Sequence, residues 1–157
     1  MNTLIFGVIL IALVALVLAM LKNMGRSSGD HGPWPFYAKK PLTPPEQVLY
    51  HRLVAAMPEC IVLAQVQLSQ VLGVRAGVNY YQWHNRINRM SLDFLLLLKD
   101  STIVAAIELD DNSHETPLRI TADTKKEKAL RAAAVPLVRW NVRALPDRSA
   151  IRQAFTK

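Results

Sequence analysis

The sequence has very little cysteine: one thiol, Cys60, in 157 residues. A single cysteine excludes an intramolecular disulfide, and it suits a reducing compartment. Internal repeats are also absent, so the length fits one domain of ordinary size plus an appendage. Acidic residues are outnumbered, with 12 Asp and Glu against 19 Lys and Arg, which gives a formal net charge of +7. That surplus indicates either an anionic partner, nucleic acid or lipid, or a merely basic solvated surface.

Charge is missing altogether from Leu4 to Leu21. As a helix rising ~1.5 Å per residue, this run would span roughly 27 Å, close to the hydrocarbon thickness of a bilayer. The alternative is a cleaved signal peptide, which needs a basic start and a small-residue cleavage site. Neither is present, because Met1–Thr3 carries no basic side chain and Leu18-Ala19-Met20 is a poor cleavage site. We therefore predict that residues 1–21 form a retained transmembrane anchor.

Basic side chains follow this run and do not precede it. By the positive-inside rule they predict a single-pass protein of the inner membrane with its C-terminal domain in the cytoplasm. Residues 22–42 are rich in glycine, serine and proline, which is typical of a flexible linker. The linker's aromatic side chains would either dip into the membrane interface or pack on the domain, and the sequence leaves both open. The basic residues are Lys22, Arg26, Lys39 and Lys40, and the aromatic residues are Trp34, Phe36 and Tyr37.

The remaining residues, 43–157, have the periodicity of one folded domain. Thr43-Pro44-Pro45-Glu46 is a helix-start signal with Thr43 as the N-cap, and apolar residues follow at helical spacing until Pro58. Residues 61–68 indicate a strand. Residues 91–98 and 102–109 indicate a hairpin, with the turn at 99–101. The connecting stretch 71–90 is ambiguous.

The C-terminal third predicts a helix at 119–134, a strand at 135–142 and a short helix at 149–155. The helix predicted at 119–134 lacks the glycine expected at its end, where the sequence has Ala132-Ala133-Ala134-Val135. The whole order is helix, three strands, helix, strand, helix. Three consecutive strands and one strand reached through a helix predict an α/β fold, with a mixed central sheet flanked by helices.

Carboxylates gather where the two hairpin strands begin and end. If the turn is centred near Asp100, Asp93 lies opposite residue 107 or 108, so it can lie beside Glu108. Asp110 is two residues further along the same strand and thus on the same face. Self-repulsion makes such a cluster costly unless a cation offsets it. Two or three carboxylates on neighbouring strands are suitable ligands for Mg²⁺ or Mn²⁺.

Other polar side chains near this cluster have two interpretations each. His114 would act as a general acid or base, or a metal ligand, or would be an ordinary surface histidine. Lys126 would reach a phosphate, or would form an ion pair with Asp123 on the same helix face. Glu46 is better explained as a carboxylate at a helix start than as a ligand. The stretch from Tyr80 to Arg86 would stack on bases, but we favour packing of its rings into the core.

These motifs resemble the PD-(D/E)XK nuclease superfamily, and within it the branch around the very-short-patch mismatch-repair endonucleases. There a Glu-x-Asp followed by a histidine replaces the usual Glu-x-Lys. More narrowly, the chain resembles a bacterial family of unknown function, number 2726, from about Pro41 to Pro146. The resemblance is carried by Ser91–Phe94, Ile107–His114, Asp123-x-x-Lys126 and Val138-Arg139-Trp140.

The resemblance implies a restriction-endonuclease-like fold and a Mg²⁺-dependent phosphodiesterase that acts on DNA. Asp93, Glu108 and the Leu109 carbonyl would bind the metal, and His114 or Lys126 would assist proton transfer or stabilise charge. Asp110 stands where the catalytic lysine is usual. Two alternatives therefore remain: an inactive nuclease-fold module that binds nucleic acid or protein at the membrane, and a basic domain that rests on anionic lipid.

Overall fold

The structure is a computed structural model that describes residues 2–24, 33–111 and 117–155. It divides into two compact units, Met1–Ala38 and Lys39–Lys157. In the first unit α1 covers Asn2–Met24, and its side chains from Phe6 to Leu21 are exposed. Among the described residues, no helix has the length and apolar character needed to cross a membrane. The transmembrane anchor at residues 1–21 thus stays a prediction from the sequence.

The second unit is built around a four-stranded sheet with the order β1-β2-β3-β4. The strands are β1 (Ile61–Gln67), β2 (Ser91–Leu97), β3 (Ile103–Asp110) and β4 (Leu137–Asn141). The first three are antiparallel neighbours, and β4 is parallel to β3. A parallel pair needs a crossover, and helix α5 (Pro117–Ala132) provides it. The predicted mixed sheet is confirmed.

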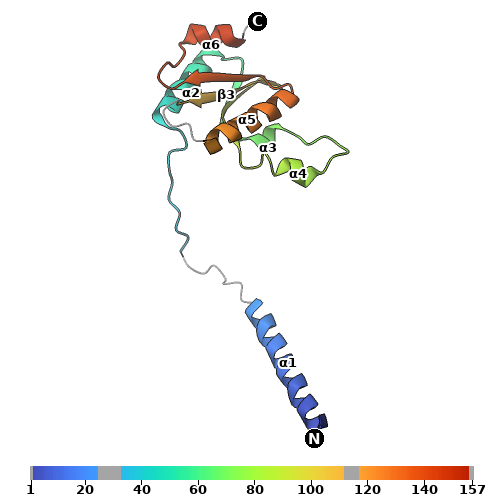
Figure 1. Ribbon diagram of the computed structural model, residues 1–157. Helices are drawn as coiled ribbons and strands as arrows, with labels where there is room; N and C mark the ends of the chain where they lie inside the picture. Colours follow the sequence, from blue (N-terminus) through green and yellow to red (C-terminus); the bar gives the residue numbers. More distant parts are fainter. Residues whose placement is uncertain (1, 25–32, 112–116, 156–157) are drawn as a thin grey trace. The chain divides into compact units, whose positions relative to one another are not determined.

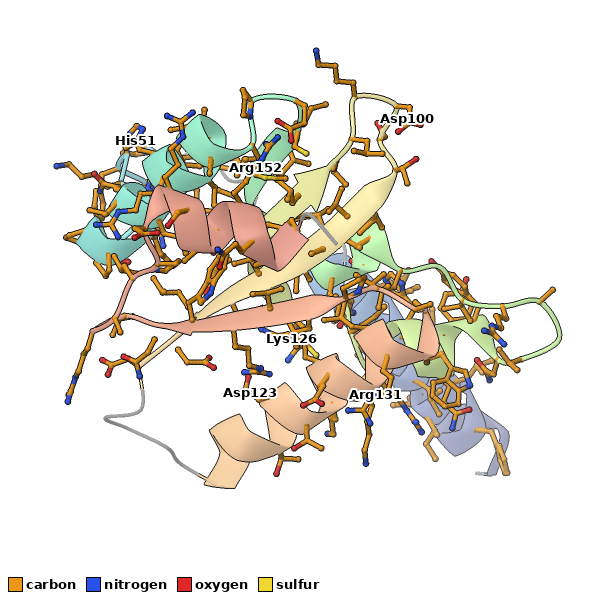
Figure 2. All side chains as sticks on the ribbon, turned by 90° about the horizontal axis from the view of Figure 1, so that it is seen from above. His51, Asp100, Asp123, Lys126, Arg131 and Arg152 are labelled. Carbon is orange, nitrogen blue, oxygen red and sulfur yellow. The ribbon has the colours of Figure 1, made fainter. Side chains whose placement is uncertain are left out.

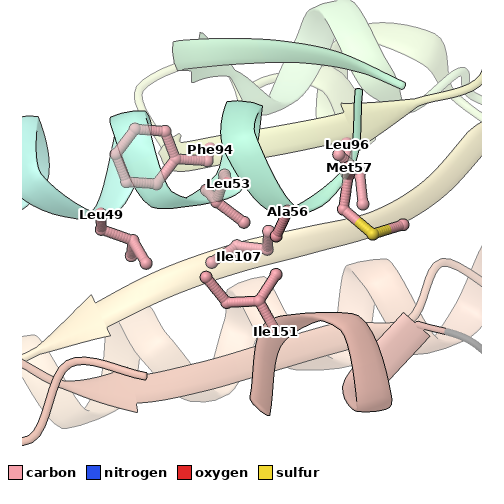
Figure 3. Packing of buried hydrophobic residues seen from close by; sticks show 8 residues of the cluster. All are labelled: Leu49, Leu53, Ala56, Met57, Phe94, Leu96, Ile107 and Ile151. Atoms are coloured by element: carbon pink, nitrogen blue, oxygen red, sulfur yellow. The ribbon is translucent and has the colours of Figure 1, made fainter. Parts of the chain in front are cut away.

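Helices cover both faces of this sheet, which gives three layers (Figure 1). Helices α2 (Pro44–Ala56) and α6 (Arg148–Phe155) pack on one face. Figure 3 shows the buried side chains of that layer meeting Phe94, Leu96 and Ile107 from the sheet. On the other face Leu130 of α5 and Leu68 of the one-turn helix α3 (Leu68–Val71) pack against Leu95 and Ala106.

Both core clusters draw only on residues from Leu42 to Phe155. The compact unit Lys39–Lys157 thus contains its own hydrophobic core, and we expect it to fold without the N-terminal unit. The apolar run of β2 explains why the sheet needs cover on both sides. Its residues Phe94 to Leu97 are buried, whereas Leu98, just beyond the strand, is 42% exposed.

Local sequence signals account for most element boundaries. The backbone N–H and Oγ1 of Thr43 donate to Glu46 Oε2 at 2.6 and 2.8 Å, as expected of a residue that starts α2. The hairpin turn is closed by Asp100, whose Oδ1 accepts from the Thr102 N–H at 2.9 Å. The ambiguous stretch 71–90 contains the last residue of α3, a second short helix α4 (Tyr80–His84) and irregular segments.

Helix α5 ends without glycine but in the geometry that glycine usually provides. Ala134 has φ +56°. The Val135 N–H donates to the Leu130 carbonyl at 3.0 Å and the Ala134 N–H to the Arg131 carbonyl at 3.1 Å. This is the Schellman pattern, with alanine in the left-handed position. Alanine is strained there, because its Cβ approaches a carbonyl oxygen.

Candidate metal-binding site

A row of polar side chains crosses the sheet where β3 ends. Phe94 pairs with Ile107, so the next positions outward, Asp93 and Glu108, lie opposite each other on β2 and β3. Glu108 pairs in turn with Arg139 on β4. On β1, Gln65 lies between the residues that pair with Phe94 and Leu92, and thus opposite Asp93. We call Gln65, Asp93, Glu108 and Arg139 the polar row.

The carboxylate of Asp93 is fixed by the neighbouring strand. Its Oδ2 accepts a hydrogen bond from the Leu109 N–H at 2.8 Å. Burial raises the pKa of Asp93, the Leu109 hydrogen bond lowers it, and the negative charge of Glu46 raises it further. A carboxylate that is held in place and partly desolvated is suited to bind a cation that neutralises it.

Glu108 is the one charged residue that is fully buried among the described residues, with 7% of its surface exposed. Lys126 reaches it from α5, and its Nζ lies 2.8 Å from Glu108 Oε1. Figure 2 shows Lys126 between that helix and the sheet. Burial raises the pKa of Glu108 to about 7, although the Lys126 ammonium and the Arg139 guanidinium oppose the shift. Desolvation therefore outweighs the attraction of the two cations.

Asp110, the third predicted carboxylate, has a different partner. Arg139 Nη1 lies 3.2 and 3.3 Å from its two carboxylate oxygens. Both side chains are about a third exposed, 31% for Arg139 and 38% for Asp110. Burial lowers the pKa of Arg139, but its hydrogen bond and attraction to Asp110 raise it by more. In this structure Asp110 holds an arginine rather than completing a group of three carboxylates with Asp93 and Glu108.

The remaining predicted site residues differ in how they are placed. His114 lies outside the described residues. Leu109 lies on β3 beside Asp93, to which its N–H donates. Lys126 forms its ion pair with Glu108 and not with Asp123. The ion pair within α5, which was one of the two interpretations of Lys126 from the sequence, is therefore not what the structure shows. Within the part of the chain that the structure describes, no cluster of three or more His, Cys, Asp or Glu side chains is close enough to hold a metal ion.

A model of the family described as protein of unknown function (DUF2726) matches residues 38–157. The chain belongs to the DUF2726 family. The match covers the compact unit from Lys39 onward, so the polar row is part of the DUF2726 domain. No curated protein and no solved structure matches the chain.

Two contributors to the DUF2726 site were not predicted from the sequence. Arg139 becomes a site residue only through the parallel pairing of β3 and β4, whose register the sequence does not set. Gln65 has φ +52° in the middle of β1, and its side-chain amide donates to Glu46 Oε1 at 3.0 Å. Backbone strain of this kind concentrates at functional sites. Glu46 has the helix-start role predicted for it, and it also faces the row through Gln65.

Proposed function

We propose that the DUF2726 domain is a divalent-metal-dependent nuclease of the PD-(D/E)XK type that hydrolyses phosphodiester bonds in DNA. The observation that carries the proposal is the pair Asp93 and Glu108, opposite each other on adjacent strands, with Lys126 directed at the same point from α5. Apart from the short helices α3 and α4 between β1 and β2, the order α2, β1, β2, β3, α5, β4 also supports a restriction-endonuclease-like fold.

The donor set fits a hard cation. Mg²⁺ is usually held by one or two carboxylates, with waters and substrate phosphate oxygens completing an octahedron. Asp93 and Glu108 supply the carboxylates, and the main-chain carbonyl of Leu109 is the third protein ligand that we propose. A bound Mg²⁺ or Mn²⁺ would polarise the phosphate and lower the pKa of a water. Asp110 pairs with Arg139 at 3.2 and 3.3 Å and is not among the metal ligands that we propose.

In our proposal, Lys126 takes the place of the lysine that the superfamily pattern has at the position of Asp110. Asp110 occupies the position where a lysine is usual, so β3 itself carries no catalytic ammonium. The ammonium of Lys126 lies 2.8 Å from Glu108 although it comes from α5. A cation at that place stabilises negative charge that develops on the phosphoryl group in the transition state. In our proposal His114, on the segment after β3, assists proton transfer.

The test is cleavage of supercoiled plasmid and of linear duplex by fragment 39–157, with Mg²⁺ or Mn²⁺ and with a chelator. We expect the wild-type fragment to cut DNA in the presence of metal. The rate of cutting should be at least a hundredfold lower in each of the variants Asp93→Asn, Glu108→Gln and Lys126→Met. Matched controls change the same groups elsewhere: Asp100→Asn in the hairpin turn and Lys128→Met on the exposed side of α5.

Titration with Mn²⁺ gives a second measurement that does not depend on turnover. The wild-type fragment should bind Mn²⁺, and the Asp93→Asn, Glu108→Gln double variant should not. Binding without cutting would favour the inactive nucleic-acid-binding module. Equal cutting by the wild type and the double variant would refute the proposed site.

Membrane localisation is a separate part of the proposal, supported by sequence alone. We propose that the uncharged run from Leu4 to Leu21 holds the domain at the cytoplasmic side of the inner membrane, as the basic residues after it suggest. Alkaline carbonate extraction of membranes should leave the full chain in the pellet and release fragment 39–157. Release of both would refute the anchor.

A further inference from the structure

The segment between α3 and β2, residues 72–90, presents aromatic rings to solvent. Tyr80 is 52% exposed, Tyr81 76% and Trp83 46%. Our preferred sequence interpretation, that these rings pack into the core, is therefore wrong. The core contact of this segment is made by other side chains, chiefly Ile87, which is buried against Leu68 and Leu92. Figure 1 shows the segment with α4 projecting from the body of the domain.

The segment is ordered in spite of this exposure. Asn79 starts α4, and its side-chain oxygen accepts from the Gln82 N–H at 3.1 Å. At the other end the Met90 carbonyl accepts from the Leu68 N–H at 2.8 Å. Rings held on a fixed turn lose little further freedom when a ligand covers them, which favours their use as contact groups.

Cationic and aromatic groups are stacked on one another within the segment. The Arg86 guanidinium lies 4.2 Å from the centroid of the Trp83 ring. The rings of Tyr80 and His84 are stacked, with centroids 5.2 Å apart and an interplanar angle of 16°. Flat guanidinium and ring surfaces of this kind are what unpaired bases stack on in single-stranded nucleic acids.

The charge of the surrounding sequence has one sign only. No Asp or Glu occurs between Glu59 and Asp93, whereas Arg75, Arg86 and Arg89 fall in the projecting segment. A stretch of sequence with positive charges only favours contact with phosphates. The segment also ends directly before β2, whose third residue is Asp93. A strand bound there would be led toward the polar row.

We propose that residues 72–90 bind single-stranded DNA, with Tyr81 and Trp83 stacking on bases and the arginines on phosphates. A lipid surface is the less suitable partner, because the Arg86 guanidinium lies over the Trp83 ring and the exposed groups are mostly polar-edged rings rather than aliphatic side chains. The inference rests on the proposed function, because that function identifies DNA as the nucleic acid that is bound. Binding is measured without metal. A protein that binds single-stranded DNA but does not cut it would therefore contradict the proposed function and not this inference.

The experiment measures binding of the full chain to a fluorescent oligothymidylate by anisotropy, in chelator. Tyr81→Ala and Trp83→Ala should each weaken the affinity roughly 5- to 100-fold. Tyr81→Phe should bind as the wild type does, because it keeps the ring. The matched controls are Tyr37→Ala and Trp34→Ala, which remove rings of the N-terminal unit that are more exposed than Tyr81 and Trp83, respectively, and should change nothing.

Two further measurements make the outcome decisive. Replacing Arg75 by Gln should reduce the slope of log affinity against log salt by about 0.7, because one phosphate is no longer neutralised by the protein. Unchanged melting temperatures should show that the variants are folded. The proposal is overturned if Tyr81→Ala and Trp83→Ala bind like the wild type, or if the control variants lose as much. It is also overturned if the two substitutions, made in fragment 39–157, weaken binding to phosphatidylserine vesicles but not to the oligonucleotide.

Discussion

The buried carboxyl of Glu108 should make the stability of the metal-free domain depend on pH. Its pKa is about 7 in the folded protein, against an ordinary value of 4.5. Between these values the unfolded chain has released the proton and the folded chain still holds it. Stability therefore falls as pH rises through this window and is constant above it. At ~1.4 kcal/mol per pKa unit, the loss between pH 4 and pH 8 amounts to roughly 3 kcal/mol.

Urea unfolding of fragment 39–157 at a series of pH values, with chelator present, measures this effect. Other groups titrate in the same range, so the informative quantity is the free energy of unfolding of the wild type minus that of Glu108→Gln. We expect this difference to decrease by roughly 3 kcal/mol from pH 4 to pH 8. A constant difference would show that burial does not perturb Glu108. An increasing one would show that the Lys126 ammonium outweighs burial.

Metal adds a second expectation to the same experiment. A ligand must be deprotonated to bind a cation, so added Mg²⁺ should stabilise the wild type more at pH 8 than at pH 5. The Glu108→Gln variant should show a much smaller response at both pH values. If Mg²⁺ stabilises the two proteins equally, Glu108 is not a ligand.

Three further predictions concern stability, each measured as the free energy of unfolding in urea. Ala134→Gly should stabilise the domain by about 0.5–1 kcal/mol, because relief of the left-handed strain exceeds the entropy that glycine adds to the unfolded chain; a loss would contradict the observed helix end. Leu96→Ala should cost about 2–5 kcal/mol and Leu98→Ala far less, since only Leu96 is fully buried. Asp110→Asn should change stability by less than about 1 kcal/mol, because its ion pair with Arg139 is partly exposed. A larger, salt-insensitive loss would indicate that this pair is structural.

The order of elements could be predicted from the sequence because local signals agree with the tertiary fold. The Thr43-Pro44-Pro45-Glu46 start and the hairpin turn at Asp100 both rest on contacts within three residues. The apolar run of β2 predicted a strand that is buried on both faces of the sheet. The two core clusters, one on each face, confirm this. The segment 71–90 could not be assigned, because its helix α4 has only five residues and its rings face solvent. No periodicity arises from such a segment.

The candidate site was predictable as far as the hairpin reaches. Asp93 and Glu108 belong to strands joined by a short turn, and counting outward from Asp100 placed residue 107 or 108 opposite Asp93. The register shift between Leu96 and Leu97, which the count does not contain, makes that residue Glu108. Arg139 and Lys126 depend on the crossover from β3 through α5 to β4, whose register and tilt arise from packing. Lys126 pairs with Glu108 across that crossover, and not with Asp123 on its own helix.

The polar row is difficult to explain as a device for stability. Asp93 and Glu108 interrupt the apolar residues of β2 and β3. Burial raises the pKa of both carboxyl groups. Buried ion pairs such as Glu108–Lys126 contribute little net stability, because desolvation of both charges offsets their attraction. A fold selected for stability alone would be better served by apolar residues of similar size. The row contains Gln65 at φ +52° and holds Glu108 2.8 Å from the Lys126 ammonium, and we therefore infer that it serves a function other than stability.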